Sequence, residues 1–159
     1  MLTTPENAGD LDYSGDGATP GGPVRFNTKI AVVLREDLAV WQKLNMTAFL
    51  VSGVAGTDAD TIGEAYEDAS GHRYLPMFRQ PVLVFAGSAE QLRRAYDRLR
   101  AGGLCFSVFT DDLFTTGNDS DNRTAVKAVR SEDLRLAGMA LRGDRKAVDK
   151  ALKGLALHR

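Results

Sequence analysis

The sequence has few of the residues that build metal centres and disulfide frameworks. Among 159 residues it contains one cysteine, Cys105, and two histidines, His72 and His158. A single cysteine excludes an internal disulfide and a thiolate-rich zinc site, and the two histidines are far apart in sequence. The sequence therefore predicts no metal site, and a reducing, cytoplasmic setting is expected.

Charge of one sign and long apolar runs are also missing. Lys and Arg number 20 against 21 Asp and Glu, so the net charge of −1 supplies no overall field that would attract nucleic acid or an anionic membrane. No run of about eighteen apolar residues is present, and the N-terminal residues lack the basic and apolar regions of a signal peptide. We expect no export, no membrane partner and no general affinity for nucleic acid.

The hydrophobic pattern predicts a single α/β domain over residues 26–159, preceded by a flexible N-terminal tail over residues 1–25 that is rich in Gly and Pro. The order expected is strand, helix, strand, helix, strand, two further strands and a final helix. Asp37, Ser88 and Asp144 are the expected helix caps. Strands are predicted at residues 29–34, 82–86, 104–109, 124–130 and 136–141, with a short helix near residues 62–66.

Residues 109–126, FTDDLFTTGNDSDNRTAV, carry many Asp, Thr and Asn side chains directly after an apolar run. Ligands of open α/β sheets gather at the carboxyl ends of strands, so Asp111 and Asp112 would meet Asp37 if the first and third strands are neighbours. Paired carboxylates of this kind can act as acid and base or orient a water molecule. A solvated turn is the alternative, whereas a calcium loop lacks its required glycine.

Other polar side chains are candidates to complete a substrate cleft. Asn45 lies in the middle of the first predicted helix, where its amide either faces solvent or has a positioned partner. Thr115 and Thr116 offer hydroxyl groups close to the two Asp residues. The remaining candidates for substrate binding are Arg35 at the strand end, Lys43, Ser52 and His72, although a solvated surface position also accounts for His72.

Six segments, spaced along most of the chain, carry a family resemblance: VLREDL, KLNMTAFLVSG, IGEAYEDASGHRYLPMFRQPVLV, FTDDLFTT, NDSDNRTAV and AVDKALKGLALH. Together they resemble the type II peptidyl-tRNA hydrolase superfamily. They are more closely similar to its uncharacterised bacterial relatives, the domain of unknown function 2000 family. The resemblance covers about residues 28–158, nearly the whole predicted domain.

The resemblance implies a compact mixed β-sheet flanked by helices, a homodimer and no cofactor. In the hydrolases an Asp after a strand is followed by a Thr four residues on, a spacing that Asp111 with Thr115 and Asp112 with Thr116 both keep. The Lys and His on the first helix of the hydrolases have no counterpart at the matching positions here, and residues 117–135 are inserted as an expected hairpin. Because a polyanion is held by basic side chains, these losses argue against peptidyl-tRNA hydrolysis.

The sequence thus favours a hydrolase or acyl-transfer enzyme for a small ester or amide. Asp111 or Asp112 would activate water, while Asn45, Thr115 and Thr116 would hold the substrate or an oxyanion. The alternative is a non-catalytic binding or interaction protein that kept the fold and lost the hydrolase residues. A small-molecule ligand is expected first, and a tRNA-like ligand stays open.

Overall fold

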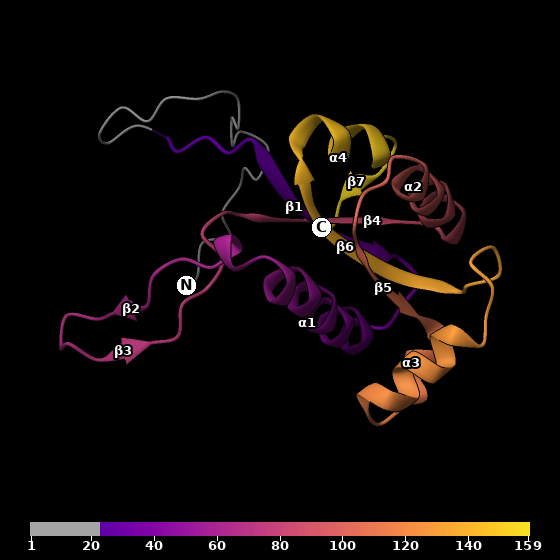
Figure 1. Cartoon of the computed structure of the whole chain (residues 1–159), viewed down its shortest axis with the longest axis horizontal. Coiled ribbons are helices and arrows are strands. Elements are labelled where there is room, and N and C mark those ends of the chain that lie inside the picture. The colour runs from indigo at the N-terminus through magenta and orange to yellow at the C-terminus, as the bar shows by residue number, and fades with distance from the viewer. Residues whose placement is uncertain (1–22) are drawn as a thin grey trace.

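The computed structural model describes residues 23–159, so most of the tail expected at residues 1–25 lies outside the described residues. Five strands form one sheet (Figure 1): β1 (Thr28–Arg35), β4 (Val82–Gly87), β5 (Ser107–Thr110), β6 (Leu136–Asp144) and β7 (Ala156–Leu157). Their order is β5-β6-β1-β4-β7. β1 and β4 are parallel, and the other pairings are antiparallel. The expected mixed sheet flanked by helices is therefore confirmed.

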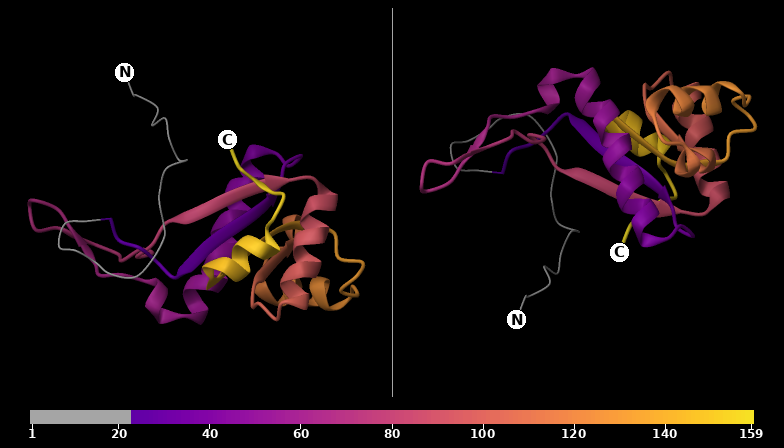
Figure 2. Two further views of the ribbon diagram at one scale, coloured as in Figure 1. Left: turned by 90° about the horizontal axis from the view of Figure 1, so that it is seen from above. Right: turned by 90° about the horizontal axis from the view of Figure 1, so that it is seen from below.

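Three helices cover the two faces of this sheet (Figure 2): α1 (Val40–Thr57) on one face, and α2 (Ala89–Ala101) and α4 (Arg145–Ala151) on the other. The predicted caps at Ser88 and Asp144 are confirmed, since both side chains accept a hydrogen bond from the first turn of their helix. The predicted cap at Asp37 is wrong. α1 begins after Ala39, and the Asp37 carboxylate accepts a hydrogen bond from Arg35 instead.

The central strand β1 divides the core into two layers. Ile30 and Val32 belong to the cluster that packs under α1, whereas Ala31 and Val33 belong to the cluster that packs under α2 and α4. All four side chains are fully buried. A strand covered on both faces cannot alternate apolar and polar residues, which explains the continuous apolar run in this part of the sequence.

The predicted strand at residues 124–130 and its hairpin are wrong, because most of this segment lies in helix α3 (Asp119–Lys127). The Asn118 side chain accepts a hydrogen bond of 2.9 Å from Asp121 N and caps the helix. Acidic residues in the first turn and Lys127 in the last turn suit the helix dipole. A run of seven residues can fit both the two-residue repeat of a strand and the 3.6-residue repeat of a helix. The cap and the charged residues at the two ends of the segment therefore decide that it is a helix.

Residues 63–79, called the arm below, form a hairpin that stands out from the body of the molecule (Figures 1 and 2). At its base Ile62 forms an isolated bridge with Phe78. The helix expected near residues 62–66 is therefore wrong. The elements of this region are a short 3-10 helix, η1 (Ala59–Thr61), and two short strands, β2 (Tyr66–Glu67) and β3 (Arg73–Tyr74).

Candidate functional site

The carboxyl end of β1 places a cation between two carboxylates. Arg35 Nε donates to Asp37 Oδ1 at 2.7 Å, and Arg35 Nη1 donates to Asp111 Oδ1 at 2.8 Å. Nη1 also lies 2.9 Å from the Leu136 carbonyl oxygen at the start of β6. Because β6 lies between β1 and β5, the first and third predicted strands are not neighbours. Arg35 reaches across β6 and joins their ends.

These groups line a cavity of about 700 Å³, called the strand-end cleft, together with Arg93 and Arg94 of α2. Burial disfavours the charged form of Arg35, but hydrogen bonds and charges from Asp37 and Asp111 outweigh burial and raise the pKa of its guanidinium. The cation is therefore fixed in place. Each of the two carboxylates accepts a hydrogen bond from Arg35, so one acceptor position of each is already occupied.

Asp112 has a different partner from Asp111. Its Oδ1 accepts a hydrogen bond of 2.6 Å from Arg135 Nη2, in an ion pair where Arg135 is largely exposed. Each Asp of the pair that the sequence suggested as acid and base therefore has an arginine of its own. No hydrogen bond joins these two carboxylates, because each is bonded to a different arginine.

Thr115 and Thr116 make local bonds at the end of a 3-10 helix, η2 (Asp111–Thr115). The Thr115 hydroxyl donates to the backbone carbonyl of Asp112 at 2.9 Å. The Thr116 hydroxyl lies 3.0 Å from the Leu113 carbonyl and also contacts Asn122 Oδ1. The spacing from Asp to Thr thus corresponds to a helical turn whose hydroxyl groups bond to backbone oxygens rather than to Asp carboxylates.

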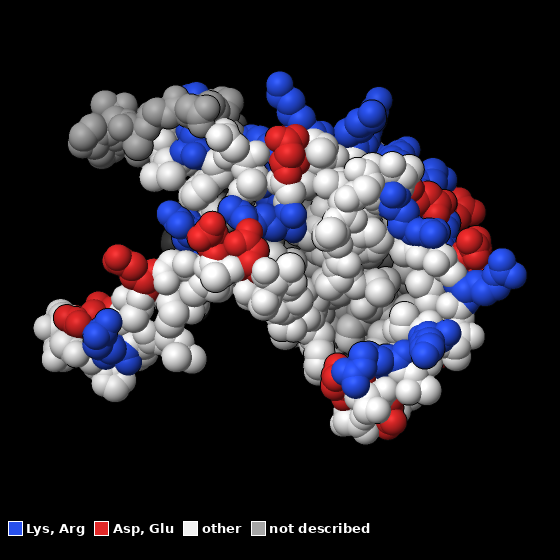
Figure 3. All heavy atoms as spheres, in the orientation of Figure 1, with Lys and Arg blue, Asp and Glu red and all other residues white. Residues whose placement is uncertain are grey.

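A second hollow lies beside α1. A cavity of about 340 Å³ is lined by Asn45 and Thr116, and an adjoining cavity of about 590 Å³ shares Phe49, Phe109 and Asn122 with it. The two together are called the α1 groove. Its walls are α1 on one side and β5, η2 and α3 on the other. Figure 3 shows mainly uncharged side chains between α1 and α3 and charged side chains at the α3 end, and Asp119, Arg123 and Lys127 of α3 line the larger cavity.

Four aromatic rings line the α1 groove in a connected row. The Trp41 and Phe114 rings are 5.9 Å apart, the Phe114 and Phe109 rings 4.8 Å, and the Phe109 and Phe49 rings 6.1 Å. Trp41 and Phe49 are more than half exposed, while Phe109 is buried. The buried Phe109 therefore joins the row to the hydrophobic core, and the exposed rings of Trp41 and Phe49 can contact a ligand.

Asn45 is exposed at the edge of this row, and its carboxamide has no hydrogen-bond partner among residues 23–159. The sequence left open whether this amide faces solvent or has a positioned partner, and in the structure it faces solvent. Asn122 faces the same cavity from α3, where Thr116 contacts its Oδ1. The Asn45 group can both donate and accept, and the Nδ2 group of Asn122 can donate, so the groove can orient a carbonyl, amide or hydroxyl group.

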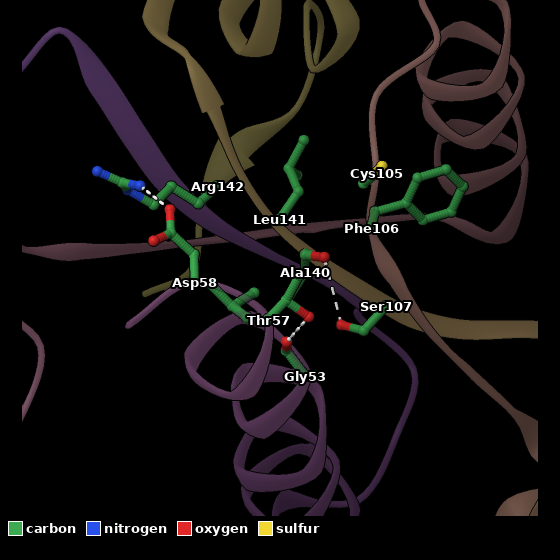
Figure 4. Close-up of a pocket in the computed structure, with 10 residues that line it drawn as sticks. Gly53, Thr57, Asp58, Cys105, Phe106, Ser107, Ala140, Leu141 and Arg142 are labelled. Atoms are coloured by element: carbon green, nitrogen blue, oxygen red, sulfur yellow. Dashed lines mark hydrogen bonds and ion pairs between the residues drawn. The ribbon is translucent and has the colours of Figure 1, made fainter. Parts of the chain in front are cut away.

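A third cavity of about 320 Å³ continues the groove past Gly53 and Ser107 (Figure 4). Ser107 Oγ donates to the Leu50 carbonyl at 2.8 Å and ties β5 to α1. A Cβ atom on Gly53 would lie 3.2 Å from Ser107 Cβ, so the close approach of α1 to β5 here depends on a small residue. An ion pair between Asp58 and Arg142 borders the cavity.

The other residues expected to bind substrate are dispersed. Ser52 lines the larger part of the α1 groove, but its hydroxyl donates to the Phe49 carbonyl at 2.6 Å. Lys43 Nζ lies 3.3 Å from His158 Nε2, close to the C-terminus. His72 lies on the arm with its ring 4.7 Å from the Tyr74 ring, away from the cleft and from the groove.

Two kinds of feature are not found in the described part of the chain. No group of three or more His, Cys, Asp or Glu side chains within residues 23–159 could hold a metal ion, and Cys105 is a free, exposed thiol. Within the same residues, no helix combines the length and the apolar composition needed to cross a membrane.

Comparison with known proteins places the chain in a family. The family described as protein of unknown function (DUF2000) matches residues 28–159. The chain belongs to the DUF2000 family. A solved structure of a protein of unknown function from Agrobacterium tumefaciens strain C58 is 46% identical, with a TM-score of 0.82 over 84% of this chain and 99% of that one. No curated protein matches the chain.

In this DUF2000 protein the single cleft expected from sequence is divided. Asp111 lines the strand-end cleft, whereas Asn45 and Thr116 line the α1 groove. The sequence alone did not identify the aromatic residues of the groove or Asn122 as site residues. The helix-capping residue Asn118 could have predicted α3, and a helix that begins there places the Asn122 side chain one turn beyond the cap.

Proposed function

We propose that this DUF2000 protein binds a small, uncharged ligand that carries an aromatic or acyl group next to a carbonyl, amide or hydroxyl group. The observation that carries the proposal is the row of aromatic rings beside the unpaired carboxamide of Asn45. Small-molecule sites are typically hollows of about 300–1,000 Å³ with apolar walls and a few placed polar groups. The α1 groove has this size, and its walls are mainly apolar, with charged Asp119, Arg123 and Lys127 on the α3 side.

The rings and the carboxamide make separable contributions to binding. Removing about 100 Å² of apolar ligand surface from water contributes roughly 2.5 kcal/mol. A hydrogen bond to Asn45 adds about 1 kcal/mol and fixes the orientation of the ligand. Because ordering the ligand offsets part of this gain, fragments of the ligand should bind weakly, with dissociation constants in the millimolar range or higher.

Trp41 provides the test, because it is the only tryptophan of the sequence and it lines the groove. Titration with benzamide and with N-acetylphenylalanine amide should change its fluorescence in a saturable way. Phe49→Ala should weaken binding about tenfold or more and Asn45→Ala about fivefold, from the lost area and the lost hydrogen bond. Arg94→Ala, on the α2 side of the sheet, is the matched control and should bind normally.

The same titrations can overturn the proposal. Absence of a saturable response to every aromatic amide would do so. Equal affinities in the wild-type protein and in the Asn45→Ala and Phe49→Ala variants would also do so, because the groove would then not be the binding site.

Hydrolysis of a small ester or amide is the second candidate, and the strand-end cleft favours it. In this scheme Asp111 orients the attacking water and Arg35 stabilises the oxyanion. With this second candidate we also predict that the protein is related to the type II peptidyl-tRNA hydrolases and is located in the cytoplasm, as expected from the sequence. Assays with p-nitrophenyl acetate and with peptide amides should then give turnover that Asp111→Asn abolishes. If neither substrate is turned over, the candidate is eliminated.

A further inference from the structure

The larger cavity of the α1 groove lies along an open edge of the sheet. β5 is the first strand of the order β5-β6-β1-β4-β7, so it has a neighbouring strand on one side only (Figure 1). Successive side chains of a strand point to opposite faces. Phe109 packs in the cluster under α1, whereas Val108 packs against the cluster under α2 and α4. Because both residues line the cavity, the cavity follows the edge of β5 rather than one face.

This edge is free to pair. Every second residue of an edge strand directs its backbone N–H and C=O away from the neighbouring strand. Within residues 23–159, only β6 pairs with the backbone of residues 107–109. Edge strands are commonly protected by charged residues, by proline or by extreme shortness. β7 at the opposite edge has only two residues, whereas Ser107, Val108 and Phe109 have none of these protections.

The α3 wall of the same cavity carries a positive charge that no carboxylate offsets. Asp119 and Arg123 form an ion pair with each other, one helical turn apart. Lys127, in the last turn of α3, is exposed and lines the cavity. It forms no salt bridge with any carboxylate of residues 23–159. A ligand that lies along β5 would therefore be favoured by a negative charge on its α3 side.

We infer that the α1 groove binds an extended peptide segment of a partner protein, which adds a strand to the open edge of β5. The segment carries an aromatic residue for the Trp41 end of the groove and an acidic residue for Lys127. The inference rests on the proposed function, because the uncharged aromatic amide would be one residue of this longer chain. Strand addition takes its affinity from main-chain hydrogen bonds and its specificity from pockets for alternate side chains.

Peptide length and backbone methylation test strand addition. The probes are acetyl-Phe-Ala-Ala-Glu-Ala-amide and its reverse sequence, because a strand can be added in either direction. One of them should bind about tenfold more tightly than N-acetylphenylalanine amide, as followed by Trp41 fluorescence, because it adds main-chain hydrogen bonds. Methylation of successive peptide nitrogens should weaken binding in alternation, since only every second N–H faces β5. Equal effects at all positions would overturn the inference.

A charge exchange tests the contact with Lys127. Glutamine in place of the peptide glutamate should weaken binding to the wild-type protein about threefold at low salt. The Lys127→Glu protein should instead prefer a peptide with lysine at that position. Lys150→Glu changes the last-turn lysine of α4, on the other face of the sheet, and is the matched control that should keep the wild-type preference. A Lys127→Glu protein that also keeps it would overturn the inference.

Hydrogen exchange of the full chain locates the bound peptide. Backbone amides of β5 that face the groove should exchange more slowly when the peptide is bound, and those of β7 should not change. If N-acetylphenylalanine amide binds but the peptide binds no more tightly and leaves β5 unprotected, strand addition is wrong and the proposed function stands. If no probe binds, both are wrong. Protection of β5 in the free protein that is lost on dilution would assign the edge to a second copy and would overturn the inference.

Discussion

Arg35 is the residue that most constrains the strand-end cleft. Its side chain is only 15% exposed, and it joins Asp37, Asp111 and the Leu136 carbonyl. A largely buried guanidinium is tolerated here because its donors are used by carboxylate and carbonyl oxygens. Its removal would leave Asp111 and a backbone oxygen without their partner at the point where β1, β5 and β6 meet.

The substitution Arg35→Ala should therefore lower the free energy of unfolding by about 1–3 kcal/mol, as measured by urea denaturation. Arg94→Ala is the matched control because Arg94 lines the same cleft but is 58% exposed. Its effect should stay within about 0.5 kcal/mol. An Arg35→Ala protein as stable as the control would contradict the role assigned to Arg35.

Gly138 and Gly56 give a second pair of predictions for single residues. A Cβ atom on Gly138 would lie 2.8 Å from Met46 Sδ and 2.9 Å from the Val33 carbonyl oxygen, so β6 passes too close to its neighbours for a side chain. Gly138→Ala should cost about 1–3 kcal/mol of stability. No atom lies within 4 Å of the corresponding position on Gly56 in α1, and Gly56→Ala should stabilise by about 0.5 kcal/mol. Thermal melts that rank the two variants in the opposite order would refute this packing.

Among the elements, those with strong end signals or long apolar runs were predictable from sequence. β1 and β4 have continuous apolar runs, and α2 begins at a Ser88 cap whose partner is Gln91. α3 and the arm were not predicted. Their apolar residues pack on few parts of the body, so hydrophobic period carries little information there, and local caps and turn residues determine the structure.

The arm is held by a hydrogen bond between a neutral phenol and an ionised carboxylate. Tyr74 Oη lies 2.8 Å from Asp68 Oδ2. This bond, with that from His72 N, lowers the pKa of Asp68, and the bond to Asp68 raises the pKa of Tyr74. The stabilisation is therefore present above the ordinary pKa of an Asp and is lost as the pH falls through the lowered value. At the alkaline end it is lost as the pH rises through the raised pKa of Tyr74.

Removing the hydroxyl group of Tyr74 tests whether its hydrogen bond lowers the pKa of Asp68. In Tyr74→Phe the pKa of Asp68 should rise towards its ordinary value, because the largest stabilising contact of the carboxylate is gone. A carbon-13 NMR titration of the carboxyl group measures the shift. Tyr66→Phe, which changes the paired position on β2, is the control and should leave the pKa of Asp68 unchanged. An unaltered titration in Tyr74→Phe would refute the contact.

For the whole molecule, sheet order decides where chemistry can occur. The sequence correctly indicated polar residues at the carboxyl ends of β1 and β5, but it could not show that β6 lies between them. It also could not show that Asp111 lies in one cavity and Asn45 in another. Sheet order depends on long-range pairing, which local patterns do not record. The division of polar groups between the two hollows is why we propose ligand binding ahead of hydrolysis.

The most direct test of ligand binding in the α1 groove is a nitrogen-15 NMR titration of the full chain with benzamide. The side-chain amide signals of Asn45 and Asn122 and the indole signal of Trp41 should shift together and saturate at one dissociation constant, because all three groups line one cavity. If these three signals stay fixed while residues of the strand-end cleft shift, or if no signal shifts, the α1 groove is not the binding site.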